Sequence, residues 1–534
     1  MVISSLPKKL QSLQSPPSKV RLRAHFPNPL KDAVAAAKTC YSPRIIHSNE
    51  VTEEETRRIG ATTYEGGHHT VYQHQMFEFE MEYVSRAFVH DFLHAQPFFN
   101  SSQQSQRYVK IDPPSAVVPP IPNRMNRRRF VKLILDSWEK YREIIEILVE
   151  DITQEQASPS LLGTAAKKMR REILEKAMEA ARYDLCIGSH TLLIHTIDGV
   201  TLWRLHRLRD LTWEASDVIG KMVDQVKRVD PGFMESVEAE VSLTLNNPTE
   251  FQHSPQASDS KNHEKFIQEF DDSLRDRRTK LIAWNEKGEE LLAEAVRTVL
   301  GLPAAAMSDE DALQLVLNPS KNTHLADNVN LSTVSPITRT MNHVQYTFRK
   351  KLSHTADSQD QRHRTIPSSK PLTIFADTRR PDYTTPLIIE RNKTAMRIHE
   401  EWMEELWEKK NQLLDDGVPS EYLSYVLPQA TTIRLEETGS LLNLWYKYMN
   451  RSCLRAEEEI WRVTMEEIAQ IKKVHQRIGS FFGPPCFIRK TAAGRSLPEH
   501  IGKIKYCNQG RLYCRQPVWN FYPKVSEENI LRVI

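Results

Sequence analysis

The sequence predicts a helix-rich α+β fold that occurs twice along one chain. Glycine is scarce, with 17 residues in 534, and long stretches carry apolar residues three and four positions apart, as helices do. Two other segments alternate large apolar and polar side chains, as half-buried strands do. Two long stretches, one in each half of the chain, also match each other without a gap.

Length and composition limit the possible classes of protein. A chain of 534 residues exceeds what one hydrophobic core normally supports, so two or more domains are expected. The apolar fraction of 40% and the charged fraction of 26% are ordinary for a soluble globular protein. A net charge of +3 gives no global field that would attract nucleic acid, so any anion binding must be local.

The termini and the hydropathy pattern suggest a cytoplasmic protein. No stretch approaches the roughly 18 apolar residues that span a bilayer. The first segment, MVISSLPKKLQSLQSPPSKVRLR, has basic residues but lacks the continuous apolar core of a secretory signal. We therefore expect a short flexible leader and no membrane partner.

Helices and strands recur in the same order in both halves. Helical periodicity is clearest in FVKLILDSWEKYREIIEILVEDI (130–152) and in RIHEEWMEELWEKKNQLLDD (397–416). Strand-like alternation occurs in HQMFEFEMEYVSR (74–86) and in NHVQYTFRKKLSH (342–354). This recurrence indicates a duplication.

A second pair of segments supports the duplication. The stretch from 181 to 210 follows a long helix in the first half, and the stretch from 423 to 452 does the same in the second. An ungapped alignment pairs Arg182 with Ser424, Leu185 with Leu427, Thr196 with Thr438 and Arg209 with Arg451. We predict a leader (1–19), a first copy (20–235), a polar linker (236–269), a second copy (270–490) and a C-terminal extension (491–534).

The number and spacing of the cysteines are those expected of reduced thiols in an intracellular protein. Three lie far apart within apolar or helical patterns, where a small buried thiol is the default reading: Cys40, Cys186 and Cys453. Three others could form a zinc site with the nearby His500, although no CxxC pair supports it: Cys486, Cys507 and Cys514. We expect no metal site.

Several polar clusters have ordinary explanations when each is taken alone. The run QDQRHRTIPSSKP (359–371) would be a solvated basic face. Ser105 and Arg107, on either side of a glutamine, would form a polar turn. Arg209 and Arg451 would be surface arginines whose stems lie over apolar rows of a helix.

Together these segments resemble the flavin-dependent thymidylate synthases. That family shares a pattern close to SRxxxxQxxRHR, then seven residues and SxRY, and later GVPxxxARxVLP. Here SQQSQRY (102–108) is similar to the SxRY end, SHTADSQDQRHR (353–364) to the RHR end and DGVPSEYLSYVLP (416–428) to the later block. The resemblance implies two tandem thymidylate synthase complementing protein-like domains, each with a central, mostly antiparallel sheet.

Each copy keeps the half of the pattern that the other has lost. The first copy retains Ser105, Arg107, Arg182 and Arg209, but its RHR position reads HAQ (94–96) or AQP (95–97). The second copy matches at Gln359, Arg362, His363, Arg364 and Arg451, but Leu372 and Ile374 replace its SxR residues and Ser424 replaces an arginine. Because the family builds its sites between subunits, a fused pair could retain one composite site.

The resemblance assigns a role to each matching residue. Arg209 would be the catalytic cation that favours an ionised uracil N3. The implied nucleotide-binding residues are Gln103, Ser105, Arg107, Arg182, Gln359, Arg362 and Arg451. The implied flavin-binding residues are His68, Thr70, Arg362, His363 and Arg364. FAD would be the cofactor, with NADPH and methylenetetrahydrofolate as co-substrates.

Replacements at four positions leave alternatives open. Gln103 replaces an acidic residue, Asp198 and Val200 stand where the family has a flavin-contacting asparagine and arginine, and Ser424 removes an arginine. The chain could instead be a pseudoenzyme that binds flavin or a pyrimidine nucleotide, or a structural helical scaffold. The family's homotetramer implies a homodimer of this fused chain.

Overall fold

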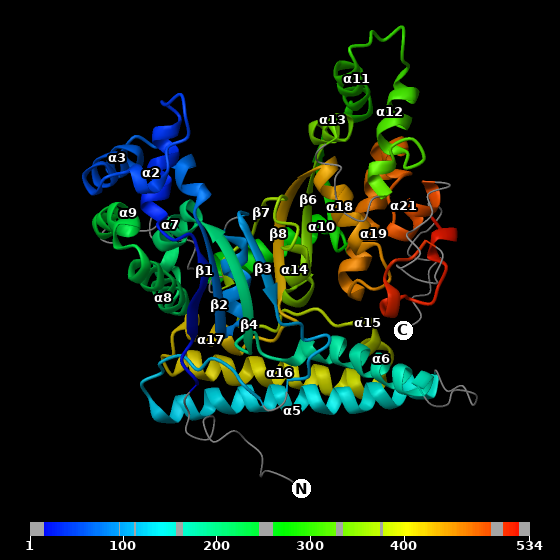
Figure 1. Cartoon of the computed structure of the whole chain (residues 1–534). Coiled ribbons are helices and arrows are strands. Elements are labelled where there is room, and N and C mark those ends of the chain that lie inside the picture. The colour runs from blue at the N-terminus through cyan, green and yellow to red at the C-terminus, as the bar shows by residue number, and fades with distance from the viewer. Residues whose placement is uncertain are drawn as a thin grey trace. The chain divides into compact units, whose positions relative to one another are not determined.

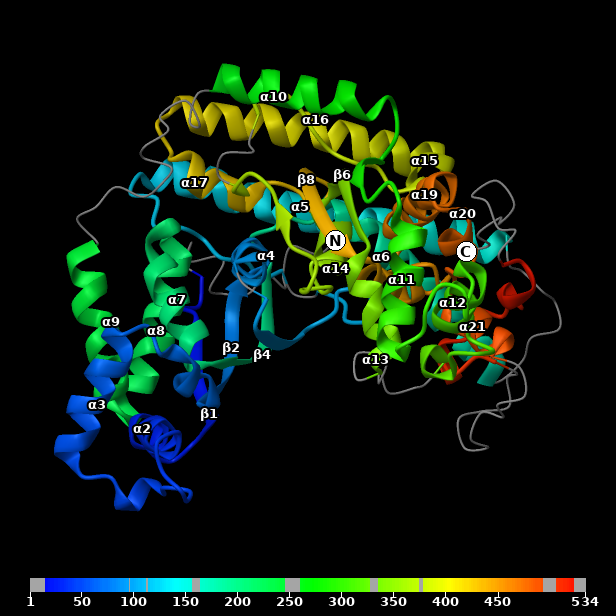
Figure 2. The same cartoon turned by 90° about the horizontal axis from the view of Figure 1, so that it is seen from above.

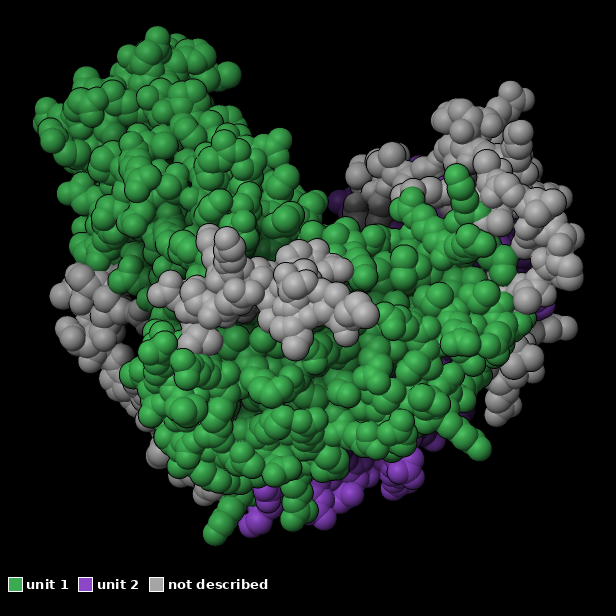
Figure 3. All heavy atoms as spheres, turned by 90° about the horizontal axis from the view of Figure 1, so that it is seen from below, with its two compact units in different colours: residues 1–263, 372–381, 391–429 green, residues 264–371, 382–390, 430–534 purple. Residues whose placement is uncertain are grey.

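The protein is described from a computed structural model at residues 15–95, 97–111, 114–155, 164–244, 260–326, 335–373, 378–492 and 506–522. The chain divides into two compact units (Figure 3). The first contains 1–263, 372–381 and 391–429, and the second contains 264–371, 382–390 and 430–534. Most of the predicted leader, the middle of the predicted linker, Gln96, Ile374 and His500 lie outside the described residues.

The first unit contains a four-stranded antiparallel sheet with the order β1-β2-β4-β3 (Figure 1). Its strands are β1 (Lys19–His25), β2 (Met76–Ser85), β3 (Phe99–Gln103) and β4 (His190–Asp198). Alternate side chains of β2 are buried in one hydrophobic core, among them Phe77, Phe79 and Met81. The alternation that predicted this strand therefore reflects one buried face.

Helices surround this sheet and extend away from it. At one end of the unit α2, α3 and α9 gather (Figures 1 and 2). The α-helices of the unit are α2 (Pro29–Thr39), α3 (Glu53–Glu65), α4 (Arg86–His94), α5 (Arg124–Glu155), α6 (Thr164–Ala181), α7 (Gly199–Leu208), α8 (Trp213–Val229), α9 (Pro231–Thr244), α16 (Lys393–Asp415) and α17 (Ser420–Leu423). Its 3₁₀ turns are η1 (Ser48–Glu50), η2 (His69–His74), η3 (Arg182–Asp184), η4 (Arg209–Leu211) and η9 (Ser424–Val426).

The second unit repeats the sheet with the order β5-β6-β8-β7. Its strands are β5 (Thr279–Trp284), β6 (Gln345–Ser353), β7 (Ser368–Ser369) and β8 (Thr432–Ser440). Because the strands at corresponding positions have the same order and the same antiparallel pairing, the two copies share one topology. The predicted α+β fold in two tandem copies is confirmed.

The helices of the second unit pack around a separate hydrophobic core. They are α10 (Ser260–Leu274), α11 (Gly288–Leu300), α12 (Asp309–Leu317), α13 (Pro336–Arg339), α14 (His354–Asp360), α15 (Leu387–Arg391), α18 (Leu441–Arg451), α19 (Glu458–Val474), α20 (Gln476–Gly479) and α21 (Pro485–Thr491). The 3₁₀ turns are η6 (Thr323–Ala326), η7 (Thr340–His343), η11 (Gly510–Leu512) and η12 (Val518–Asn520). Within the described residues, no helix is both long and apolar enough to cross a bilayer.

A buried serine and glutamate pair occurs at the same place in both copies. Ser85 caps α4, and its hydroxyl donates to Glu214 at 2.5 Å. Ser353 caps α14, and its hydroxyl donates to Glu459 at 2.5 Å. The helix after the central strand is thus fixed in the same way twice, by a side-chain cap and a buried carboxylate.

Two equivalent turns of the copies pair with each other inside the first unit. The backbone N–H of Ile187 donates to the carbonyl of Leu427 at 2.8 Å, and the N–H of Gln429 donates to the carbonyl of Leu185 at 2.8 Å. The alignment of Leu185 with Leu427 relates these two bonds to each other, so the contact has local two-fold symmetry. Gly188 is required here, because a Cβ at this position would lie 2.6 Å from the carbonyl oxygen of Tyr425.

A long helix of the second copy also belongs to the first unit. The helix α16 lies along α5 (Figures 1 and 2). Its buried His399 places Nδ1 2.9 Å from the carboxylate of Asp184, and Trp402 donates to the Asp184 carbonyl at 3.3 Å. The two long helices predicted from periodicity therefore pack together in one unit.

Candidate functional site

Three of the predicted site residues of the first unit gather around one glutamate. Arg107 forms an ion pair with Glu179 of α6. The Ser105 hydroxyl accepts the backbone N–H of Arg107 at 3.3 Å, and Arg182 donates from Nε to the Glu179 carbonyl at 3.2 Å. The Glu179 carboxylate, which also pairs with Lys176 at 3.0 Å, thus occupies an anion position beside the Arg107 guanidinium.

Arg209 and Gln103 lie at the ends of other elements of this unit. Gln103 is the last residue of β3 and pairs in register with Leu193 of β4. Arg209 directly follows α7, and its Nη1 lies 3.5 Å from Nδ1 of the buried His206. Both side chains are half-buried. Arg209 therefore places a planar guanidinium with several N–H donors at the end of α7.

His68 and Thr70 lie on the turn that leads into β2. Both side chains are exposed, whereas the intervening His69 turns its ring to the backbone carbonyl of Tyr64, with Nε2 at 2.9 Å. In the described residues, no hydrogen bond connects His68 or Thr70 to the group around Glu179. The structure therefore does not bring all seven first-copy residues to one point.

Sequence reasoning missed a pocket next to this turn. It has a volume of about 880 Å³, within the range of small-molecule sites. Aromatic side chains form much of its lining: Tyr64, His69, Tyr72, Trp203 and Phe233. Charged residues at its mouth include Arg207, which pairs with Glu240 and donates to the Tyr64 hydroxyl at 3.3 Å. The spacing of Trp203 and Arg207, four residues apart on α7, was the available signal.

In the second unit, three predicted residues meet directly. Arg451, at the end of α18, donates from Nε to Nε2 of His363 at 3.1 Å. The same guanidinium donates to the backbone carbonyl of Gln359 at 2.5 Å and to its side-chain oxygen at 3.4 Å. The residues come from segments about ninety positions apart, so the fold rather than local sequence brings them together.

The Gln359 amide retains a donor that no group in the described residues uses. Its oxygen accepts from Arg451, whereas its Nε2 is buried without a hydrogen-bond partner in the described part of the chain. A buried unsatisfied donor is unfavourable unless a ligand or water fills the role. The donor is therefore suited to a carbonyl or phosphate oxygen of a bound nucleotide or flavin.

His363 is neutral at physiological pH. Burial, together with the positive charges of Arg451 and Lys447, holds the pKa of His363 well below its usual range. The neutral ring accepts the Arg451 hydrogen bond at Nε2, which leaves Nδ1 protonated as a possible donor. Of the two flanking residues, Arg362 is exposed and Arg364 is half-buried, and burial lowers the pKa of Arg364.

A buried ion cluster lies directly beneath this segment. Lys350 of β6, with none of its side chain exposed, places Nζ 2.8 Å from Asp360, 2.5 Å from Glu437 and 2.7 Å from Glu467. Lys447 of α18 pairs with Asp360 at 2.8 Å and also with Glu437. Burial alone would lower the pKa of Lys350, but the three carboxylates raise it well above its usual value. Because Asp360 ends α14 and its carbonyl accepts the N–H of His363 at 3.0 Å, the cluster anchors the site segment.

The positions where each copy departs from the family have structural roles. Asp198 caps α7 by accepting the N–H of Thr201 at 2.7 Å. Val200, 5% exposed, packs in the first core, and the equivalent Leu442 packs in the second. Ser424 is buried, and its hydroxyl donates to the Glu421 carbonyl at 2.7 Å. None of these side chains supplies a charge for a ligand phosphate.

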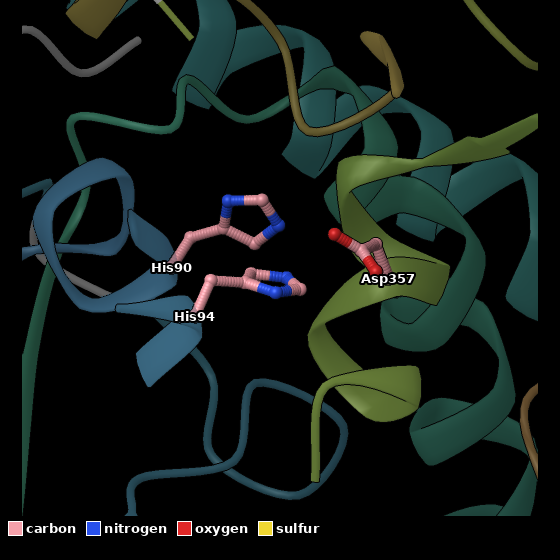
Figure 4. A group of neighbouring side chains, drawn as sticks. All are labelled: His90, His94 and Asp357. Atoms are coloured by element: carbon pink, nitrogen blue, oxygen red, sulfur yellow. The ribbon is translucent and has the colours of Figure 1, made fainter. Parts of the chain in front are cut away.

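The helix that replaces the RHR segment in the first copy carries two histidines. His90 and His94 lie one turn apart on α4, with ring centroids 4.8 Å apart (Figure 4). The corresponding helix of the second copy, α14, carries the buried Asp357, drawn in the same figure. Of the second copy's replaced SxR residues, Leu372 is half-buried.

Comparison with known proteins identifies relatives of both copies. The family model described as thymidylate synthase complementing protein matches residues 21–232 and 280–475. A flavin-dependent thymidylate synthase of Clostridium tetani is 30% identical over 222 residues, which cover 41% of this chain and 85% of that protein. Enzymes of the same name from Sulfurisphaera tokodaii and Nitratidesulfovibrio vulgaris are 33% and 34% identical over 28% and 25% of this chain, and over 59% and 58% of their own lengths.

Proposed function

The chain belongs to the thymidylate synthase complementing protein family, and on this premise we propose that it is a flavin-dependent thymidylate synthase with one composite site per chain. The reaction would convert dUMP to dTMP. Methylenetetrahydrofolate would supply the carbon, and NADPH would reduce the flavin. The second copy would contribute Gln359, Arg362, His363 and Arg364, and the first copy would contribute the phosphate and uracil contacts.

One observation carries the proposal: Arg451 binds both His363 and Gln359. This network supports a ligand site at the RHR segment, because it fixes a neutral imidazole and leaves the buried Gln359 donor without a partner among the residues that the structure describes. A planar ligand with carbonyl oxygens at its edge fits those donors, so the residues present are compatible with flavin. FAD would supply the hydride when bound, and the protein would orient the reactants.

The first copy offers a phosphate grip. The Arg107 guanidinium already pairs through Nε with a carboxylate, Glu179, and an arginine fork can bind phosphate oxygens through two parallel bonds. Ser105 holds the turn by accepting the Arg107 N–H. In the proposed function a nucleotide phosphate competes with Glu179 for this guanidinium.

Arg209 would act on the uracil ring. Addition of a carbon at C5 requires electron density at that atom, and a fixed cation beside the base favours the ionised N3 that provides it. We propose this role for Arg209, which presents a guanidinium cation.

Flavin binding is the first test. Native protein titrated with FAD should develop bound-flavin absorbance, with at most one flavin per chain, because only one copy retains the RHR residues. Arg362→Ala combined with His363→Ala should abolish it, whereas the single replacement His94→Ala at the corresponding first-copy position should not. Saturating FAD without bound absorbance, or two flavins per chain, would contradict the composite site.

The reaction itself is tested by tritium release. Dimeric protein with C5-tritiated dUMP, methylenetetrahydrofolate, FAD and NADPH should release tritium, and Arg209→Ala should stop the release while FAD binding persists. Flavin binding without tritium release in the unaltered protein would refute the synthase and leave a flavin-binding pseudoenzyme. Measurement of mass in solution, which should give a dimer, tests the proposed assembly of two fused chains.

A further inference from the structure

Four of the six cysteines gather in the second unit. Cys453 follows α18, Cys486 lies in α21, and Cys507 and Cys514 lie in the C-terminal extension. All four thiols are free. Cys486 and Cys507 lie in one hydrophobic core with Cys514 packed against it, and Tyr522 of the extension contacts Ser452 and Phe487, the neighbours of Cys453 and Cys486. Segments about sixty residues apart in the chain therefore bring the four thiols into one region of the unit.

The surroundings suit a group with negative charge. Cys486 and Cys507 are buried in the hydrophobic core of the unit, and Cys514 packs against it. Arg489 interacts electrostatically with Cys486 and Cys507, and Arg455 does so with Cys453 and Cys514. A divalent ion with four thiolates has a net charge of about −2, which two guanidinium groups would balance.

Residues 506–522 of the C-terminal extension have little regular structure to hold them in place. These described residues contain the short turns η11 and η12 and neither an α-helix nor a strand. They dock on the unit through Tyr522, whose hydroxyl donates to the Ser452 carbonyl at 3.2 Å and whose ring packs on Phe487. Segments of this kind commonly depend on a metal or another covalent link for stability.

We propose that Cys453, Cys486, Cys507 and Cys514 bind one structural Zn²⁺ ion that fastens the C-terminal extension to the second unit. Two ligands would come from the scaffold and two from the extension, and all four positions would be filled by protein, as in closed structural zinc sites. Within the described residues no three of these sulfurs lie within 4.8 Å of one another, so binding would draw them inward to Zn–S distances of about 2.3 Å. Each thiol that binds would lose its proton to solvent.

Metal content of the full chain tests the proposal. Protein purified with zinc in the medium and freed of loosely bound metal should contain one zinc per chain. The double variant Cys507→Ser with Cys514→Ser should lose it, and the matched control Cys40→Ser, which alters an exposed thiol of the first unit, should keep it. Absence of zinc from the unaltered chain, or its retention in the double variant, would overturn the proposal.

A second measurement needs no variant. Replacement of zinc by Co²⁺ in the unaltered protein should give thiolate-to-cobalt charge-transfer absorption and the visible bands of a tetrahedral thiolate site. Zinc should be released in step with modification of four thiols by a mercurial reagent. Cobalt bound without sulfur absorption, disulfide bonds among these cysteines, or an iron–sulfur chromophore in their place would each contradict the assignment.

Discussion

Replacement of Lys350 by methionine should strongly destabilise the second unit. The change removes one of two cations from a cluster that holds three carboxylates, so the buried net charge goes from −1 to −2. Removal of one partner from a buried ion pair typically costs about 3–5 kcal/mol. For a unit of this size, about 4 kcal/mol corresponds to a fall in Tm of roughly 8–16 °C.

Differential scanning calorimetry is the suitable assay, because two units need not unfold in one transition. The transition of the second unit should shift and that of the first should not. The matched control is Lys351→Met on the same strand, since Lys351 is a third exposed and pairs with Asp271 at 2.7 Å, an interaction worth less than about 1 kcal/mol. The double change Lys350→Met with Glu437→Gln should recover most of the loss, because it restores the original charge balance.

Equal shifts for Lys350→Met and Lys351→Met would refute this reasoning. So would a double variant that is no more stable than the single one, since it would mean that the cluster carries no uncompensated charge. Circular dichroism at low temperature should show that each variant remains folded, which separates a stability effect from a failure to fold.

Three further predictions concern other parts of the molecule. Arg451→Ala should weaken FAD binding by roughly tenfold to a hundredfold, because it removes charged hydrogen bonds to His363 and Gln359 worth about 1.5–3 kcal/mol; an unchanged titration would contradict the network. Burial raises the pKa of Glu214 from 4.5 to about 7 in the folded protein. As the pH rises, the unfolded chain therefore releases this proton before the folded protein does. The unfolding free energy should fall by at most about 3 kcal/mol between pH 4.5 and pH 7 and then level off. Glu214→Gln should remove that slope in urea titrations, and a slope that persists would assign it to other groups. Val200→Arg should lower the Tm of the first unit by burying a charge, whereas Val200→Ala should cost about 1–2 kcal/mol; a stable arginine variant with tighter FAD binding would show that this side chain faces the ligand.

The repeated elements could be predicted from sequence because their patterns are local. Alternation marked β2 and β6, helical spacing marked α5 and α16, and the ungapped repeat placed the turns η3 and η9 at equivalent positions. The same alternation places Lys350 on the inner face with Tyr346 and Phe348, although its neighbours Arg349 and Lys351 make the stretch look like a charged surface. The two-residue period of the strand therefore predicted that Lys350 is buried, but its charged side chain made a surface position look more natural.

Partners that are distant in the chain could not be predicted. Glu179 looks like an ordinary helix-surface acid, and only the fold places it against Arg107. Cys453 was assigned to a buried helix position, and its relation to Cys507 and Cys514 depends on how the extension docks. The pocket beside His69 required four separate helices, α2, α3, α7 and α9, to meet. The spacing of residues along the sequence does not show which of them become neighbours in the fold.

The membership of α16 in the first unit has a consequence for synthesis of the chain. The first unit includes residues 391–429, so it lacks its last helix and the paired turn at Leu427 until that part has left the ribosome. By then residues 264–371, a large part of the second unit, have already emerged. The first unit can therefore close only after part of the second unit has emerged. A gene cut at the linker would yield an N-terminal fragment with an uncovered face on α5, which would recover its partner only if both fragments were made in the same cell.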